Sequence, residues 1–211
     1  MTPNDNVLLA DVGNTHFHIY DGKKIEHLLY DDAIDRFKDQ PLYYISVKHE
    51  LGEKIEKISA WQNISSWMRI EGEYDTMGVD RKALCLSREN GIFVDAGSAI
   101  TVDVVVKGVY VGGFILPGLK VYVESYKTIS PALAIKLNRG IRLNLLPTTT
   151  KDGISYGIIA SIKALIDQHR EGKSLYITGG DGRFLSSFFE DVIYDEMLVF
   201  EGMKKAIKNK G

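Results

Sequence analysis

The chain has little cysteine, proline or tryptophan: one, five and two of them among 211 residues. The single cysteine, Cys85, cannot form a disulfide within the chain, which is typical of proteins from a reducing compartment. We interpret Cys85 as a packed core residue, because its apolar neighbours stand at helical spacing. No run reaches the roughly 20 apolar residues of a membrane span, and the N-terminus lacks the basic start and cleavage site of a signal peptide. We expect a cytoplasmic protein without a membrane segment.

A charge excess is also absent, and so are the common nucleotide-binding motifs. The formal net charge is −2, so no overall field attracts nucleic acid, and no nucleic-acid partner is expected. The chain has no Gly-x-x-x-x-Gly-Lys-Ser/Thr loop and no Gly-x-Gly-x-x-Gly fingerprint. The five histidines show no metal-ligand spacing. We interpret His16 and His18, two apart on a predicted strand, as structural or solvated.

The sequence does contain an internal repeat, with an offset of 84 residues from Asp11 to Asp95. The two copies are VLLADVGNTHFHIYDG and IFVDAGSAITVDVVVKG. Each passes from an apolar strand to Asp-x-Gly and a small polar residue, and then to an alternating strand that ends in a glycine turn. We predict two similar α/β lobes that face each other, residues 1–89 and residues 90–211. Two unrelated hairpins are the alternative.

The remaining pattern alternates predicted strands with predicted helices, as in α/β folds. In the first half it predicts strands at 23–30, 42–47 and 64–70, and helices at 31–40 and 49–61. In the second half it predicts a hairpin that turns at Lys107-Gly108, a strand at 174–178, and helices at 117–129, 151–169, 183–189 and 201–209. This order indicates a mixed sheet with flanking helices in each lobe.

The Asp-x-Gly ends of the two strands predict a ligand site, because open α/β sheets bind ligands at the carboxyl ends of their strands. Gly13 lets the backbone approach a phosphate, and Asn14, Thr15 and successive backbone N–H groups can donate to its oxygens. Asp11 would repel phosphate directly, so we expect a Mg²⁺ ion between this carboxylate and the phosphates. The alternative is an ordinary turn, since Asp, Gly and Asn are common turn residues.

Three further stretches carry residues suited to ligand binding or chemistry. MGVDRKA places Asp80 and Arg81 at a predicted helix start, where a carboxylate can act as a general base and an arginine can bind an anion with two hydrogen bonds. The alternative is that Asp80 only favours the helix dipole. VGGFILPG, residues 111–118, permits close backbone approach to a ligand or close packing of the lobes. TGGD, residues 178–181, is a third glycine turn after a strand.

Together these motifs resemble the type III pantothenate kinases, in the actin-like, hexokinase-type ATPase superfamily. DVGNT resembles the family's first phosphate motif, VDAGSAITVD its second, and GVDR its Gly-x-Asp-Arg motif. GGFILPG resembles its glycine-proline motif, and TKDGISYG a later threonine-to-glycine segment. The motifs follow the family order from Asp11 to Asp181. The resemblance implies an α/β fold of two similar ribonuclease H-like, actin-like lobes, each a mixed sheet with flanking helices.

The resemblance also implies an activity: ATP-dependent phosphorylation of pantothenate to 4'-phosphopantothenate, the first step of coenzyme A biosynthesis, with Asp80 as general base. The residues implied to bind ATP are Asp11, Val12, Gly13, Asn14, Thr15, His16, Phe17, His18 and Ser98. Those implied to bind pantothenate are Tyr74, Gly78, Val79, Asp80, Arg81 and Thr150. Tyr74 is shifted from the family's usual tyrosine, because it stands four residues before Gly78.

The resemblance further implies ions and an assembly. Asp11 would hold Mg²⁺, and Asp95 would bind a monovalent cation, K⁺ or NH₄⁺. Such a cation would add positive charge near the phosphates, and neither Asp-x-Gly turn contains a lysine. Ser98 replaces the family's usual threonine but keeps a hydroxyl. Family members are usually homodimers with the substrate pocket near the subunit interface.

Two alternatives to this function stay open. The first is a kinase of another small-molecule acceptor on the same scaffold, against which the Gly-x-Asp-Arg motif argues. The second is a non-catalytic nucleotide-binding regulatory protein. Degenerate motifs would indicate such a protein, and here Asp11, Asp80, Arg81 and Asp95 are all present.

Overall fold

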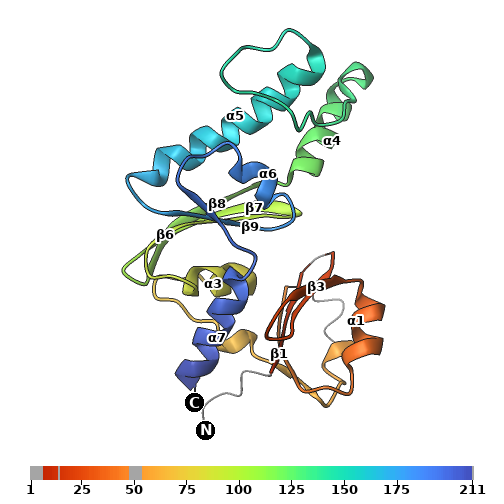
Figure 1. Ribbon diagram of the computed structural model, residues 1–211, viewed down its shortest axis with the longest axis vertical. Helices are drawn as coiled ribbons and strands as arrows, with labels where there is room; N and C mark the ends of the chain where they lie inside the picture. Colours follow the sequence, from red (N-terminus) through yellow and green to blue (C-terminus); the bar gives the residue numbers. More distant parts are fainter. Residues whose placement is uncertain (1–6, 14, 48–53, 211) are drawn as a thin grey trace. The chain divides into compact units, whose positions relative to one another are not determined.

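The computed structural model describes residues 7–13, 15–47 and 54–210. The chain divides into two compact units (Figure 1). Unit 1 consists of residues 1–89, 105–111 and 196–211, and unit 2 of residues 90–104 and 112–195. The boundary between two lobes at residues 89 and 90, which the sequence suggested, stays a prediction. None of the helices in the described part of the chain combines the length and apolar character that a membrane crossing needs.

Unit 1 contains a mixed five-stranded sheet in the order β3-β2-β1-β4-β5. Its strands are β1 (Leu8–Val12), β2 (Phe17–Tyr20), β3 (Ile25–Leu28), β4 (Leu42–Ser46) and β5 (Trp61–Asn63). β2 pairs antiparallel with β1 and β3, whereas β4 pairs parallel with β1 and β5. Side chains alternate along a strand, so Leu8, Ala10 and Val12 join one apolar core. Asp11 therefore lies on the opposite face of this sheet.

The helices of unit 1 are α1 (Tyr30–Phe37), α3 (Val79–Leu86) and α7 (Leu198–Lys210). α3 and α7 pack so closely that a Cβ on Gly202 would overlap the carbonyl oxygen of Ala83. Phe200 of α7 packs beside Tyr20 of β2, with ring centroids 5.7 Å apart, which ties α7 to the sheet. Cys85 of α3 is 1% exposed, so its prediction as a packed core residue is confirmed.

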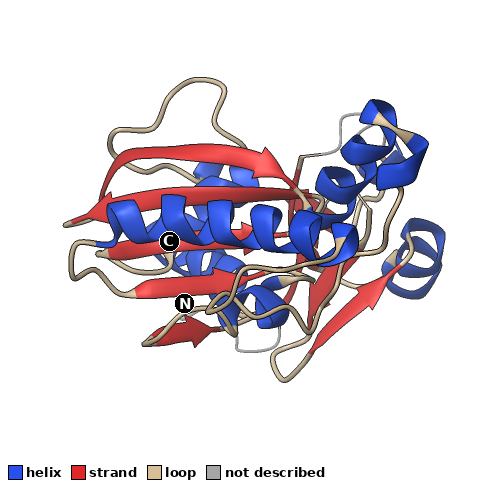
Figure 2. Ribbon diagram, turned by 90° about the horizontal axis from the view of Figure 1, so that it is seen from above, coloured by secondary structure: helices blue, strands red, loops and turns tan. Residues whose placement is uncertain are grey.

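Unit 2 contains a second mixed sheet in the order β10-β9-β6-β7-β8. Its strands are β6 (Gly91–Ala96), β7 (Ala99–Val106), β8 (Val109–Pro117), β9 (Leu175–Thr178) and β10 (Val192–Tyr194). Its helices are α4 (Leu119–Ile129), α5 (Thr150–Arg170) and α6 (Gly182–Ser186). The long helix α5 runs along one face of the sheet (Figure 2), and its Ile158 and Ile162 belong to the same apolar core as Ile92 and Val94 of β6.

The two sheets have the same strand order when β1–β5 are matched in sequence with β6–β10, and the strand with the Asp-x-Gly motif is the middle one in each. The match extends to a hydrogen bond. Val47 N donates to the carbonyl oxygen of Val12 (3.3 Å), and Asp181 N donates to that of Ala96 (2.9 Å). The predicted repeat is therefore confirmed, and so is the fold class of two mixed α/β sheets.

The predicted hairpin at Lys107-Gly108 is also confirmed, since both residues have positive φ, 53° and 77°, as a two-residue turn requires. The predicted strand at 64–70 is wrong, because the 3₁₀ turn η1 (Ser65–Trp67) occupies it. The strand lies earlier, in β5. Trp61 Nε1 donates to the carbonyl oxygen of Phe37 (3.0 Å), and Asn63 Oδ1 accepts from Ser65 N (2.9 Å), which turns the chain out of the sheet.

The helix predicted at 49–61 can be compared with the structure only from residue 54 onward. Residues 48–53 lie outside the described part of the chain. Lys54 and Ile55 are helical, but Trp61 already belongs to β5, so the predicted end of this helix is wrong. The cause is the parallel pairing of Trp61 with Leu42 of β4, a long-range contact that helical periodicity does not report.

Candidate active site

The first Asp-x-Gly turn joins β1 to β2 in unit 1. Gly13 N donates to the carbonyl oxygen of His16 (3.1 Å), and the Tyr30 hydroxyl donates to the carbonyl oxygen of Gly13 (2.7 Å). A Cβ on Gly13 would meet nothing closer than 3.5 Å, so glycine is not needed here for internal packing. Its lack of a side chain instead leaves the backbone open to a ligand. Tyr30, which the sequence analysis missed, steadies the turn.

The other predicted ATP-binding residues of this turn lie in different environments. Val12 and Phe17 are buried in the apolar core of unit 1 and can contribute only backbone groups to a ligand. Asp11, His16 and His18 are half-buried, and Thr15 is exposed. Asn14 lies outside the described residues. The structure thus brings the motif together at the carboxyl end of β1, where a phosphate site was predicted.

A row of polar side chains crosses the same sheet next to the turn. Asp11 pairs with His18 in the β1–β2 ladder, and His18 pairs with His27 in the β2–β3 ladder. The pKa of His18 is lowered to about 4, first because burial disfavours its charged form and then because His27 and His16 add like charge. His18 is therefore neutral at neutral pH. No local sequence pattern singles out His27, because only the register of β3 reveals the pairing.

The Gly-x-Asp-Arg motif begins helix α3. Gly78 is the N-cap residue, and Asp80 lies in the first turn, where a carboxylate favours the helix dipole. Arg81 N donates to Asp80 Oδ1 (2.8 Å), so the half-buried carboxylate folds back over the start of the helix. A Cβ on Gly78 would lie 2.5 Å from that oxygen, so a larger residue would make the Asp80 side chain move. Val79 is the first helical residue and is half-buried.

Arg81 is a buried cation between two tyrosines, only 5% exposed. Its Nη1 donates to the Tyr74 hydroxyl (2.5 Å) and its Nη2 to the Tyr110 hydroxyl (3.3 Å). The guanidinium also lies 5.7 Å from the Tyr74 ring centroid, within cation–π range. Tyr74 therefore contacts the motif despite its shifted position. Tyr110 was missed, because it comes from β8, 29 residues along the chain.

The second Asp-x-Gly turn joins β6 to β7 in unit 2. Gly97 N donates to the carbonyl oxygen of Ala99 (2.9 Å), and Asp95 is half-buried. Gly179 has φ +89°, and a Cβ there would overlap Asp95 Oδ1 and lie 2.7 Å from the carbonyl oxygen of Ala96. The TGGD turn is thus packed directly against the Asp95 carboxylate, and only glycine fits between them.

The remaining predicted residues of unit 2 are exposed. Ser98 lies at the surface of the second turn, and its carbonyl oxygen accepts from Gly118 N (3.2 Å), so Gly118 of the glycine-proline motif packs against this turn. Thr150 is the first residue of α5 and is exposed. Thr149 caps that helix by accepting from Asp152 N (3.2 Å). Asn138 and then Thr149 lower the pKa of Asp152 by hydrogen bonding.

For each predicted ion the described residues offer a carboxylate ligand, but they form no larger cluster of metal-binding side chains. No group of three or more His, Cys, Asp or Glu side chains that could hold a metal ion occurs in the described part of the chain. Mg²⁺ in phosphate sites commonly uses one or two carboxylates together with waters and the phosphates, and Asp11 fits that role. The Asp95 carboxylate, beside the carbonyl oxygen of Ala96, offers the hard oxygen ligands that a monovalent cation takes.

Solved structures support the fold assignment. The activator of 2-hydroxyisocaproyl-CoA dehydratase from Clostridium difficile, solved with bound ADPNP, covers 97% of this chain and 96% of its own, with a TM-score of 0.55 and 10% identity. A structure described as a candidate 2-dehydro-3-deoxygalactonokinase from Sinorhizobium meliloti has a TM-score of 0.61 and 10% identity, over 97% of this chain and 99% of its own. At such identities the likeness shows the fold alone, two mixed α/β sheets with flanking helices.

Sequence comparisons give the family. The type III pantothenate kinase profile matches residues 47–171. The type III pantothenate kinase of Helicobacter hepaticus is 40% identical, over 97% of this chain and 100% of its own length. The type III pantothenate kinase of Campylobacter jejuni strain RM1221 is 39% identical, over 96% of this chain and 97% of its own length. A Campylobacter jejuni crystal structure, described as a candidate Baf family transcriptional activator, has a TM-score of 0.88 and 39% identity. The match covers 97% of this chain and 98% of that one. The chain belongs to the type III pantothenate kinase family.

Proposed function

We propose that this chain transfers the γ-phosphoryl group of ATP to the primary hydroxyl of pantothenate, with Asp80 as the base that accepts the hydroxyl proton. Family membership supports the reaction. The observation that carries the residue assignment is the start of α3. There Asp80 is held by the Arg81 backbone, and the buried Arg81 side chain lies between Tyr74 and Tyr110. A carboxylate and an oriented cation side by side suit an acceptor with both a hydroxyl and an anionic group.

Phosphoryl transfer asks a protein mainly for positioning and charge neutralisation. In the proposed site Arg81 binds the pantothenate carboxylate, because a guanidinium has five donors and two tyrosines hold it in one orientation. Asp80 accepts the proton as the hydroxyl oxygen attacks the γ-phosphorus and the bond from that phosphorus to the β–γ bridging oxygen breaks, which releases ADP. The backbone of the Gly13 turn binds ATP phosphate oxygens, and Ser98 and Thr150 contact ATP and pantothenate at the surface of unit 2.

The proposed ions add charge that the side chains do not supply. Mg²⁺ held by Asp11, and K⁺ or NH₄⁺ held by Asp95, would neutralise negative charge on the phosphates. Asp11 lies in β1 between the buried residues Ala10 and Val12, and the Asp95 carboxylate packs against the TGGD turn. A cytoplasmic location and a homodimer belong to the same proposal.

The test is to incubate the purified protein with Mg-ATP and pantothenate, in potassium buffer and separately in sodium buffer. We expect phosphopantothenate, detected by mass, in potassium and much less in sodium. Equal product in both buffers would contradict the cation role of Asp95 but not the kinase. No product in either would contradict the proposed activity.

The two alternative functions predict different results in the same assay. The Campylobacter jejuni relative that is described as a candidate transcriptional activator favours the regulatory alternative. A regulatory protein would bind ATP and form no product with any acceptor. A kinase of another acceptor would leave pantothenate unchanged but phosphorylate a different small alcohol in an acceptor screen. The net charge of −2 argues against direct DNA binding.

A further inference from the structure

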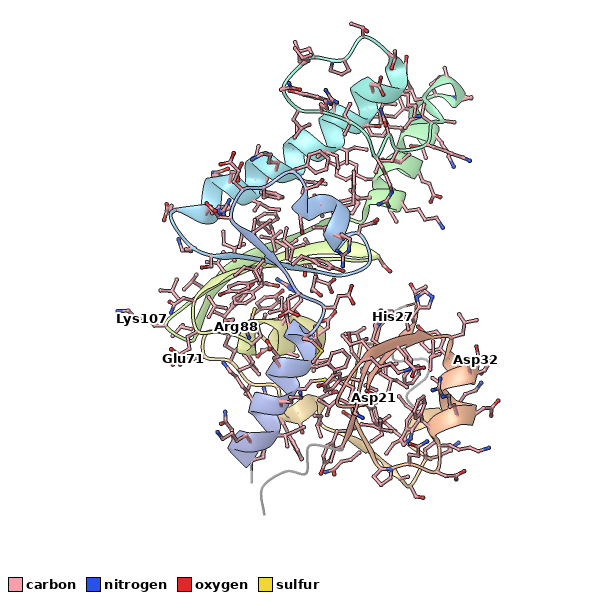
Figure 3. The ribbon with its side chains drawn as sticks, in the orientation of Figure 1. Asp21, His27, Asp32, Glu71, Arg88 and Lys107 are labelled. Carbon is pink, nitrogen blue, oxygen red and sulfur yellow. The ribbon has the colours of Figure 1, made fainter. Side chains whose placement is uncertain are left out.

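A histidine pair lies next to the Gly13 turn: His18, which the family resemblance implies binds ATP, and His27, which belongs to none of the motifs described above. The Nδ1 atoms of His18 and His27 lie 2.5 Å apart, and the rings meet edge to face with centroids 4.8 Å apart. The two residues are direct partners in the β2–β3 ladder, so strand register creates the contact. Figure 3 labels His27 on β3, an edge strand of the sheet in unit 1.

The other end of the His18 ring faces the turn. His18 Nε2 would be 3.8 Å from a Cβ on Gly13, and Cδ2 would be 3.9 Å from it. The Nε2 edge therefore lies beside the backbone that we propose for phosphate binding. His18 thus has one ring nitrogen on His27 and the other next to the space that a Gly13 side chain would fill.

The short nitrogen–nitrogen distance determines how protons are arranged. One of the two Nδ1 atoms must donate and the other accept, so one proton lies between them. A neutral histidine has one ring proton, which lies on either Nδ1 or Nε2. With the proton on Nδ1, Nε2 would present a lone pair to the turn; with the proton on Nε2, it presents a donor.

Phosphate chemistry selects between these two states. The oxygens of an ATP phosphate carry negative charge and accept hydrogen bonds, so a lone pair on Nε2 would repel them. The donor state requires His18 Nδ1 to accept, and its partner in the structure is His27 Nδ1. His27 must then donate.

We propose that His27 is a positioning residue for ATP: it donates a hydrogen bond from Nδ1 to Nδ1 of His18 and so holds the Nε2–H of His18 toward the phosphates at the Gly13 turn. This inference rests on the proposed kinase function, in which ATP phosphates bind at that turn. His27 itself acts only through His18 and touches no substrate.

The first test compares two substitutions of His27. His27→Leu removes the donor, and His27→Asn keeps an N–H near the position of Nδ1. Because a net hydrogen bond contributes about 1 kcal/mol, we expect His27→Leu to raise the KM for ATP about three- to tenfold, with kcat and the KM for pantothenate changed less than about twofold. His27→Asn should keep a KM for ATP near that of the unchanged protein. His169→Leu, a histidine substitution on α5, serves as the control and should change none of these constants.

The second test uses the unchanged protein, so it decides the question even if His27→Leu fails to fold. Histidine ring ¹⁵N NMR at pH 7.5, with ADP bound, reports which ring nitrogen of His18 carries the proton. We expect a protonated Nε2 and an unprotonated Nδ1. His27→Asn should show the same His18 state.

Three results would overturn the proposal: an unchanged KM for ATP in His27→Leu, equal impairment in His27→Asn and His27→Leu, or a proton on Nδ1 of His18 with ADP bound. Failure of the unchanged protein to form phosphopantothenate is a separate result. It would count against the proposed function, while the NMR measurement with ADP would still test His27.

Discussion

At the residue scale, a substitution of Asp80 should lower the turnover rate without weakening ATP binding. Replacing Asp80 with Asn keeps the size of the side chain and its oxygen for the Arg81 N–H but removes the base. We expect kcat to fall by about 10²–10⁴-fold, the usual contribution of a general base. ATP binding, measured by calorimetry, should stay within about twofold, because Asp80 is proposed to contact pantothenate and not ATP. Normal turnover in Asp80→Asn would remove Asp80 from the mechanism.

A second residue-scale prediction concerns His18 and acid stability. The folded pKa of about 4 lies below the ordinary value of 6.5, so between these values the unfolded chain binds a proton that the folded chain does not. The free energy of unfolding therefore falls as the pH drops from about 6.5 to 4. Between pH 7 and pH 5 we expect His18 to account for a loss of about 1–2 kcal/mol.

Urea unfolding at both pH values, for the unchanged protein and for His18→Gln, measures this contribution. The variant should lose less stability than the unchanged protein between pH 7 and pH 5. An equal loss in both proteins would show that His18 titrates normally in the folded state.

At the scale of elements, the packing of α3 against α7 depends on one glycine. A Cβ on Gly202 would overlap the carbonyl oxygen of Ala83, so Gly202→Ala must push the helices apart. We expect a cost of about 1–3 kcal/mol and a lower melting temperature by roughly 3–10 °C, since overpacking strains both backbones. α3 carries the Gly-x-Asp-Arg motif, so activity should fall as well.

The chain offers a matched control for this substitution. Gly157 lies in α5, and a Cβ there would meet nothing within 4 Å. Gly157→Ala should therefore leave the melting temperature unchanged or raise it, because alanine favours a helix by about 1 kcal/mol over glycine. If both variants melt alike by differential scanning calorimetry, the close approach of α3 and α7 is not what Gly202 provides.

At the scale of the whole molecule, exposed apolar side chains bear on the predicted assembly. Three large apolar side chains of unit 2 are strongly exposed: Ile129 at 71%, Leu145 at 73% and Leu146 at 81%. Exposed apolar side chains of this kind often mark a protein interface. We expect light scattering to give twice the chain mass of 23.6 kDa. Leu146→Glu should shift that mass toward the monomer, and a monomeric unchanged protein would contradict the predicted homodimer.

Much of the fold could be predicted from local sequence. The Asp-x-Gly repeat, the turn at Lys107-Gly108 and the helical spacing of α5 are patterns within a few neighbouring residues, and the structure confirms each of them. The failures occurred where a distant partner decides the local structure. Pairing of Trp61 with Leu42 of β4 makes a strand of a segment whose own pattern predicts a helix.

By itself the sequence predicted which residues would carry the chemistry, because Asp11, Asp80 and Arg81 stand in short motifs whose spacing is local. Only the tertiary structure decided what supports them. Strand register puts His27 against His18, and β8 brings the Tyr110 hydroxyl to Arg81. The physical reason is that hydrogen-bond partners across a sheet, or between a strand and a helix, depend on long-range pairing. No periodicity within one segment encodes that pairing.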